Sequence, residues 1–406
     1  MTPPRSADQD LVRKVNKSLV LNTLRLHAPI SRAAIAKLTG LNRSTVTHIV
    51  NALLDENLVL EQPVPSFAVG RPSIALVLNP LGGAIIGVEI GVDFVSVVAA
   101  DFVAQPIWQS TQVISPLSPQ ADILAQAEAV IDQAICAAQD RGQHVIGIGV
   151  GLPGLVNVNL GELVYAPNLG WRSLPLEQRW SQRFQLPIYM DNEANLAALG
   201  EYYFGQAHKV ENFIYLNSGI GLGGGVVIAG KLFRGGHGFA GEIGHVQRDP
   251  QGEWCGCGRR GCWETQVGPR AMLRRLQKSL ADTPTDLLPP GFPADLSQLT
   301  FEMIVNAADT GDPACLAALQ EVAYHLGAGI ADLVNVFNPD MVIIGGLLSL
   351  ARHLMLPEIE KTVREQSLAP SVSQTKITFS ERGKDACIFG AVAIVLDDIL
   401  REAAIS

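Results

Sequence analysis

Ile85-Ile-Gly-Val-Glu-Ile-Gly91, followed by Phe94-Val-Ser-Val-Val-Ala-Ala100, consists of two apolar runs joined by a glycine-containing turn. Short apolar runs bounded by turn residues are typical of buried β-strands. The same scheme recurs at Phe213-Ile-Tyr-Leu-Asn-Ser-Gly-Ile-Gly-Leu-Gly-Gly-Gly225, which is followed by Val226-Val-Ile-Ala229. We therefore expect two related lobes, with a ligand-binding cleft between them.

Each predicted strand pair is followed by a helical pattern and then another strand. In the first lobe these are a helix over 119–141 and a strand over 145–151. In the second lobe they are a long helix over 313–337 and a strand over 341–345. This order of elements favours an α/β fold in which helices cover mixed sheets on both faces.

Length, composition and charge predict a multidomain protein with a basic head. A chain of 406 residues, 48% of them hydrophobic, is long enough for two or three domains. No apolar run reaches the roughly 18 residues that a membrane helix needs, so no membrane insertion is expected. No secretory signal is visible either, which predicts a cytoplasmic location. The first 76 residues carry nine basic and five acidic side chains, against 21 and 34 in the remainder, so the head is the part expected to bind a polyanion.

Three short helical patterns occupy the first part of the chain. The first extends over 16–27, and the second, over 32–39, has Ser31 as a candidate N-cap and Gly40 for the turn that leaves it. The third begins after a cap at Asn42 or Ser44 and carries its apolar residues on one face. Three short helices with a glycine in the second turn predict a helix-turn-helix motif.

Polar side chains gather at the start of the third helix, where a recognition helix contacts base edges and phosphates. The candidate DNA-binding residues are Asn42, Arg43, Ser44, Thr45, Thr47 and His48. A merely solvated helix face is the alternative. Two predicted strands, over 58–61 and 73–78, follow and form a wing whose loop contains Gly70-Arg71-Pro72. Arg71 is the candidate for insertion into a narrow minor groove.

One histidine and three clustered cysteines form a candidate metal site. The four residues are His245, Cys255, Cys257 and Cys262. One nitrogen and three sulfur donors suit tetrahedral zinc and leave no coordination position open, which predicts a structural Zn²⁺. Free buried thiols are the alternative interpretation.

The stretches Gly241-Glu-Ile-Gly-His-Val246 and Cys255-Gly-Cys-Gly-Arg-Arg-Gly-Cys-Trp-Glu264 closely resemble the signature of the ROK family (repressor, open reading frame, kinase). The resemblance covers nearly the whole chain. It implies a winged helix-turn-helix domain followed by a two-lobed actin-like, ribonuclease-H-like sugar-kinase fold. The expected divisions are a DNA-binding domain over 1–80, a first lobe over 81–190 to which a C-terminal helix over 384–406 returns, and a second lobe over 191–383.

The family resemblance also implies a sugar site. Asn192 and Glu193, in the motif Asp191-Asn-Glu-Ala-Asn195, match two positions that contact sugar hydroxyls. The remaining matches are Gly154, Asn168, Glu242, His245 and Glu264, of which His245 also belongs to the metal set. Carboxylates accept hydrogen bonds from paired hydroxyls, and an Asn amide also donates. The alternatives are that Asn192 simply caps a helix and that Glu242 is a helix-terminal carboxylate.

The chain departs from the kinases of this family at two places. The Asp-x-Gly-Gly-Thr-Lys-like phosphate loop is replaced by Glu89-Ile-Gly-Val-Asp-Phe94, which puts Val92, Asp93 and Phe94 at phosphate-gripping positions. The position of the family's catalytic Asp is occupied by Glu193, whose extra methylene moves the carboxylate by about an ångström. These departures predict a protein without kinase activity and, with the winged head, resemble the xylose-operon repressor branch.

We therefore predict a sugar-responsive transcriptional repressor of carbohydrate-utilisation genes. It is expected to bind a palindromic operator as a dimer or higher homo-oligomer and to be released by a monosaccharide such as xylose or glucose. One alternative is a ROK-type sugar kinase with a regulatory DNA-binding head. Another is release from DNA by a protein partner.

Overall fold

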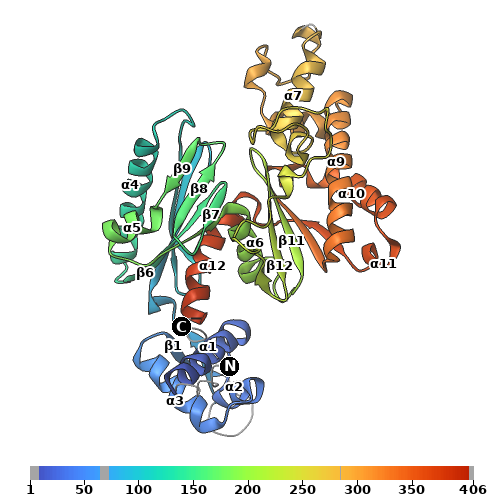
Figure 1. Cartoon of the computed structure of the whole chain (residues 1–406). Helices are drawn as coiled ribbons and strands as arrows, with labels where there is room; N and C mark the ends of the chain where they lie inside the picture. The colour runs from blue at the N-terminus through green and yellow to red at the C-terminus, as the bar shows by residue number, and fades with distance from the viewer. Residues whose placement is uncertain (1–8, 65–72, 284, 402–406) are drawn as a thin grey trace, which may run out of the picture.

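The computed structural model describes residues 9–64, 73–283 and 285–401. A small helical head, coloured blue in Figure 1, lies below two larger lobes, each built around a β-sheet. The head connects to the first lobe through a short 3₁₀ turn, Pro80–Gly82. No helix in the described part of the chain is long and apolar enough to span a membrane.

The head contains the three predicted helices and a strand pair. These are α1 (Gln9–His27), α2 (Arg32–Thr39), α3 (Arg43–Asp55), β1 (Val59–Val64) and β2 (Ser73–Leu78). The predicted caps are confirmed: the Ser31 side chain accepts a hydrogen bond from the Ala34 amide, and Gly40 ends α2 with φ 70°. Of the two candidate caps for α3, Asn42 is the one used.

Helix α1 begins at Gln9, seven positions before the predicted start at 16. Within the part of these additional turns whose side chains are described, the apolar residues Val12 and Val15 are 45% and 38% exposed. Apolar periodicity therefore could not reveal them. The predicted wing strands are also present, because β1 and β2 pair antiparallel from Val59–Leu78 to Val64–Ser73. Arg71, the predicted minor-groove residue, lies outside the described residues.

The first lobe is built on a five-stranded sheet in the order β10-β6-β3-β4-β5. Helices α4 and α5 contribute to its core, and a three-stranded sheet, β7-β8-β9, lies beside it. The bounds are β3 (Ala84–Ile90), β4 (Phe94–Asp101), β5 (Pro106–Val113), α4 (Gln120–Gln139), β6 (Val145–Leu152), β7 (Leu155–Asn157), β8 (Glu162–Ala166), β9 (Trp171–Leu174), α5 (Leu176–Phe184) and β10 (Ile188–Asn192).

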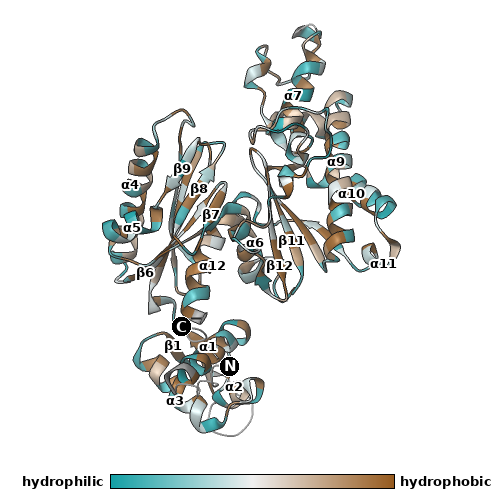
Figure 2. Cartoon of the chain, viewed as in Figure 1, coloured by the Kyte–Doolittle hydropathy of each residue, from teal (hydrophilic) through white to brown (hydrophobic). Residues whose placement is uncertain are grey.

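The second lobe repeats this plan with the order β13-β12-β11-β14-β15, so the predicted internal repeat is confirmed. In both sheets the first strand pairs antiparallel with the second and parallel with the fourth. The bounds are α6 (Glu193–Phe204), β11 (Phe213–Ser218), β12 (Leu222–Ile228), β13 (Lys231–Leu232), α7 (Pro269–Leu280), α8 (Phe301–Asp309), α9 (Pro313–Phe337), β14 (Met341–Gly346), α10 (Arg352–Gln366), α11 (Ala369–Val372), β15 (Lys376–Phe379) and α12 (Ala386–Arg401). Hydrophobic residues concentrate on the strands of both sheets (Figure 2).

Helices α6 and α12 pack against each other between the two sheets (Figure 1). Their close approach requires a glycine, because a Cβ on Gly390 would lie 1.7 Å from the carbonyl oxygen of Leu196. Strand β10 pairs with β6 through Asn192, so it extends beyond the expected lobe division at 190/191. The C-terminal helix returns to the first lobe, where it packs on β3 and β6.

Candidate functional site

The start of α3 presents most of the predicted DNA-binding side chains to solvent. Arg43, Ser44 and His48 are exposed, and Thr45 is half-buried. Three of the predicted residues also make local side-chain hydrogen bonds. Asn42 Oδ1 accepts from the Thr45 amide at 2.7 Å and from the Ser44 hydroxyl at 2.8 Å, and the Thr47 hydroxyl donates to the Arg43 carbonyl at 2.8 Å. The free hydrogen-bonding groups at this helix start are therefore mainly those of Arg43 and His48.

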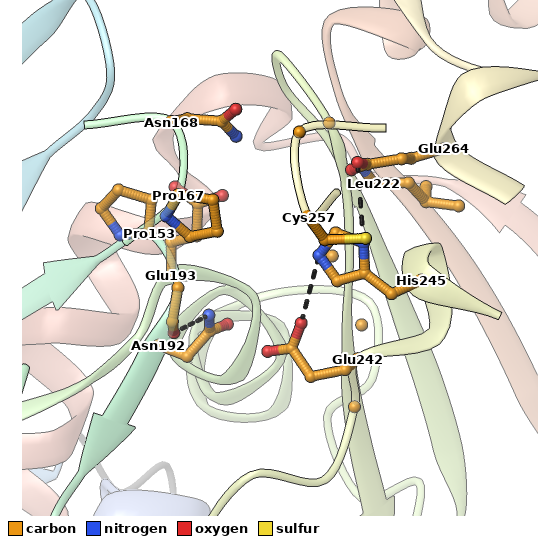
Figure 3. A pocket seen from close by; sticks show the side chains of 16 residues that line it. Pro153, Pro167, Asn168, Asn192, Glu193, Leu222, Glu242, His245, Cys257 and Glu264 are labelled. Carbon is orange, nitrogen blue, oxygen red and sulfur yellow. Dashed lines mark hydrogen bonds and ion pairs between the residues drawn. The ribbon is translucent and has the colours of Figure 1, made fainter. Parts of the chain in front are cut away.

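A pocket between the two lobes brings together all seven residues predicted to contact a sugar. Figure 3 shows Asn168, Asn192 and Glu193 on one side and Glu242, His245 and Glu264 on the other. The lining residues are Pro153, Gly154, Pro167, Asn168, Asn192, Glu193, Gly221, Leu222, Gly223, Gly224, Gly241, Glu242, His245, Gly256, Cys257 and Glu264. Residues far apart in sequence thus form one polar site.

On the first side, Asn192 occupies the junction between β10 and α6. Its Oδ1 accepts a hydrogen bond from the Ala194 amide at 2.8 Å, which caps α6. Its Nδ2 donates to the Gly154 carbonyl at 2.9 Å and so connects this junction to the turn after β6. Capping and a place in the pocket, which had been alternatives, therefore occur together. Glu193 follows as the first residue of α6.

On the second side, His245 lies between two carboxylates. Its Nε2 is 3.7 Å from Glu242 Oε2, and its Nδ1 is 3.6 Å from Glu264 Oε1. Glu264 Oε2 also accepts from the Leu222 amide at 3.4 Å, which ties this carboxylate to β12. Glu242 is the N-cap residue of the 3₁₀ helix Ile243–His245, so it does lie at a helix terminus, but its side chain makes no capping hydrogen bond. The alternative position and a place in the pocket therefore occur together.

The carboxyl groups of the pocket are electrostatically strained. Burial and the neighbouring Glu242 raise the pKa of Glu193 to about 7, although a hydrogen bond from Asn217 opposes this rise. Burial also raises the pKa of Glu242, with His245 lowering it and Glu264 raising it. Desolvation and like charges both favour the neutral acid. Hydroxyl donors from a ligand would relieve this strain by solvating the carboxylates.

The predicted metal quartet is assembled. The four ligand atoms of His245, Cys255, Cys257 and Cys262 all lie within 4.8 Å of one another. His245 Nδ1 is 3.5 Å from Cys255 Sγ, and the sulfur atoms of Cys257 and Cys262 are 3.6 Å apart. A tetrahedron with Zn–S about 2.3 Å and Zn–N about 2.0 Å has edges of roughly 3.5–3.8 Å, so these separations fit zinc.

The protonation of the cysteines also bears on metal binding. Burial raises the pKa of the Cys257 thiol, but hydrogen bonds from Arg259 more than offset this and lower it to about 7. Burial raises the pKa of Cys255, whose thiol donates to Glu264 Oε1 at 2.7 Å. A metal on this quartet would replace that proton, because thiolate is the form that ligates.

The turn between β3 and β4, where the family resemblance implies a phosphate loop, is filled by a side chain. A Cβ on Gly91 would lie 2.3 Å from the Phe94 ring, so the ring packs directly on the glycine. The Gly91 amide is occupied as well, since it donates to the Phe94 carbonyl at 2.9 Å. The carboxyl of Glu89 is buried, and burial with nearby Glu193 raises its pKa well above the ordinary value.

Three polar residues near the pocket were not predicted from the sequence. Asn217 hydrogen-bonds the Glu193 carboxylate. Asp191, which is buried, pairs with Arg234. The position of Asn217 at the end of β11, beside a glycine-rich turn, could have drawn attention to it. Nothing local in the sequence connects Arg234 with Asp191.

Comparison with known proteins agrees with this architecture. The ROK family model matches residues 85–398, and a winged helix-turn-helix DNA-binding model matches residues 14–59. A xylose repressor from Caldicellulosiruptor bescii is 36% identical over 96% of this chain and 97% of its own length. The xylose repressor of Bacillus subtilis is 32% identical over 97% of this chain and 98% of its own.

Solved structures are similar either to the whole chain or to its two-lobed body alone. A ROK family transcriptional regulator, described as a homologue of the E. coli MLC protein, superposes with TM-score 0.82 at 29% identity and covers 97% of this chain and 99% of its own. A ROK family glucokinase from Streptomyces griseus, solved with glucose and AMPPNP, gives TM-score 0.69 at 32% identity and covers 77% of this chain and 99% of its own. This chain therefore belongs to the ROK family.

Proposed function

We propose that this protein is a sugar-responsive transcriptional repressor of carbohydrate-utilisation genes. One observation carries the proposal: a head with an exposed recognition helix is joined to a body in which all seven predicted sugar-contacting residues converge on one pocket. The relatives named xylose repressor support this function, since they match head and body together. A homodimer would place two recognition helices on the half-sites of a palindromic operator in the cytoplasm.

The pocket favours an unphosphorylated monosaccharide such as xylose or glucose. Among the residues that the structure describes, those lining the pocket include three glutamates and two asparagines but no lysine or arginine. Glutamate oxygens and asparagine amides suit sugar hydroxyls, whereas a phosphate group would face three carboxylates with no lysine or arginine among these lining residues.

The His245 and cysteine quartet would hold a structural Zn²⁺ that orders the loop beside the pocket. His245 would ligate through Nδ1, which faces Cys255 Sγ, and leave Nε2 directed toward Glu242. A carboxylate beside the second ring nitrogen, here that of Glu242, fixes the tautomer and orientation of a ligating histidine. The metal would thereby support the sugar-facing carboxylate, with no open position for catalysis.

Kinase activity is the competing function, favoured by the likeness to the S. griseus glucokinase. The turn at Gly91 argues against it, because the Phe94 ring covers the glycine and Asp93 adds a negative charge where phosphates would bind. Phosphoryl transfer depends on donors and cations that position the phosphates. The proposed body therefore binds sugar without phosphorylating it.

Sugar binding in the cleft would favour a closed arrangement of the lobes. Since the head adjoins the first lobe and α12, closure would change the spacing of the two heads in a dimer. A sugar lowers operator affinity only if it binds more tightly to the form that is unsuited to the operator.

A gel-shift titration of operator DNA with and without each sugar tests the proposal, beside a coupled assay for ADP release. We expect xylose or glucose to weaken operator binding and ADP release to stay at background. Arg43→Ala should weaken operator binding in either condition, whereas Arg141→Ala, which removes an exposed arginine of the first lobe, should not. Sugar-dependent ADP production would favour the kinase. If the repressor leaves operator DNA only when a protein partner is added, and not with sugar, release by a protein partner would be the favoured mechanism.

A further inference from the structure

An ion pair between Asp191 and Arg234 connects the two lobes, and Asp191 is the neighbour in sequence of the pocket residue Asn192. Arg234 follows β13 in the second lobe, whereas Asp191 belongs to β10 in the first-lobe sheet. The Arg234 Nε and Nη2 atoms lie 2.9 Å and 2.7 Å from Asp191 Oδ2. The Asp191 side chain is 1% exposed and that of Arg234 is 30% exposed. This pair is therefore well shielded from solvent, unlike a typical surface salt bridge.

Asp191 connects the pair to the first side of the pocket. Its second oxygen, Oδ1, accepts hydrogen bonds from the Asn192 amide at 2.7 Å and from Asn195 Nδ2 at 2.9 Å. Asp191 Oδ1 thus accepts two hydrogen bonds, whereas Oδ2 accepts one from Arg234 Nε and forms an ion pair with Nη2. Its orientation sets the backbone at Asn192, the residue that caps α6 and lines the pocket.

Arg234 connects the pair to the second side of the pocket. Its carbonyl accepts a hydrogen bond from the Ala240 amide at 3.1 Å, which closes the loop leading into Gly241 and Glu242. That loop contains three glycines, and Gly235 and Gly238 have φ of 69° and 90°. Glycine-rich backbone is entropically costly to order, so the loop depends on its anchors for a single conformation.

We propose that Arg234 is a positioning residue of the sugar site. Its guanidinium holds the Asn192 side of the pocket and its carbonyl holds the Glu242 side, so one residue sets their separation. The proposal rests on the proposed sugar-binding function. Arginine suits this role better than lysine, because the planar guanidinium places two nitrogen atoms, Nε and Nη2, beside the same carboxylate oxygen, whereas an ammonium would place only one there.

Four variants of the full-length protein test the proposal by xylose and glucose calorimetry. Arg234→Met should weaken sugar binding tenfold or more, and Arg234→Lys should have an intermediate effect. The double variant D191N/R234M should bind more tightly than R234M, because it removes the buried carboxylate that R234M leaves without a cation. The matched control is Arg183→Met, which breaks an exposed first-lobe pair of 2.7 Å with Asp132. It should bind like the wild type.

A second measurement separates this proposal from the proposed function. Hydrogen–deuterium exchange without sugar should be faster over 235–242 in R234M than in the wild type, with zinc content unchanged. Wild-type affinity together with unchanged exchange in R234M would overturn the inference, as would loss of zinc in that variant or a double variant no better than R234M. If the wild type binds no sugar, the proposed function fails, and exchange over 235–242 alone decides whether Arg234 positions the loop.

Discussion

The guanidinium carbon of Arg25 lies 4.3 Å from the centre of the Tyr203 ring. Arg25 is on α1 of the head, and Tyr203 is in the last turn of α6. The first residue of α6 is Glu193, which lines the pocket. A single helix of 12 residues, about 18 Å long, thus extends from the pocket to the head. One continuous cluster of buried apolar residues includes the head helices, α6 and α12.

Arg25→Met should reduce the effect of sugar on operator affinity more than it reduces operator affinity itself. Cation–π contacts contribute about 1–2 kcal/mol when shielded from water, so loss of this one should lower the sugar-induced shift severalfold. Gel shifts of Arg25→Met, Tyr203→Leu and the double variant would measure the coupling between the two residues. Lys17→Met, which breaks an exposed pair with Glu56 inside the head, serves as control. Fully additive effects would contradict coupling through this contact.

Asn42→Asp should weaken operator binding without destabilising the head. Aspartate keeps the side-chain oxygen that caps α3 at the Thr45 amide, but it brings a negative charge toward DNA phosphates. Asn42→Ala should instead cost about 1 kcal/mol of stability because the cap is lost. Thermal unfolding and gel shifts distinguish the two effects. An Asn42→Asp variant that binds operator like the wild type would place this residue away from DNA.

Cys257→Ser should lose the bound zinc and weaken sugar binding as a secondary effect. The substitution removes one of four ligands, and the loop that carries His245 and Glu264 then lacks its anchor. Elemental analysis of protein purified without chelator should give about one zinc per chain for the wild type. Cys136→Ser, at an exposed cysteine far from the quartet, should keep it. Absence of zinc from the wild type would refute the metal site.

The pKa of Glu193, raised from 4.5 to about 7, predicts a pH dependence of stability. The folded protein holds this proton more tightly than the unfolded chain, so the free energy of unfolding should fall as pH rises from about 4.5 to about 7. Glu193→Gln removes this contribution and should be more stable than the wild type by about 1–3 kcal/mol at pH 8, with a smaller difference at pH 5.

Melting temperatures between pH 5 and pH 8 measure this difference. In Glu193→Gln the melting temperature should still fall somewhat as pH rises, because the pKa of the buried Glu89 is raised as well. Asp132→Asn, at an exposed carboxylate, should retain the full wild-type slope. Parallel pH profiles for Glu193→Gln and the wild type would contradict the assigned pKa.

Local sequence patterns correctly predicted the helices whose bounds are set by apolar periodicity and by capping residues. Helix α2 has the predicted bounds because apolar spacing, a serine cap and a terminal glycine agree over ten residues. Helix α9 likewise extends from Pro313 to Phe337, between Asp312 as its cap and Asn338 in the left-handed conformation. The sugar residues were predicted by resemblance to a family motif, and the metal quartet by the chemistry of its donors.

By itself, the sequence determined the class of fold, the repeated lobes and the residue types of the site. Only the tertiary structure decided how these residues meet. Asp191 and Arg234 are 43 positions apart, and their contact depends on β10 and the segment after β13 reaching the same edge of the cleft. The contact of Arg25 with Tyr203 likewise depends on tertiary packing. The spacing of residues along the sequence indicates helices and strands. Which helices and strands come into contact depends instead on how the connections between them arrange the whole chain.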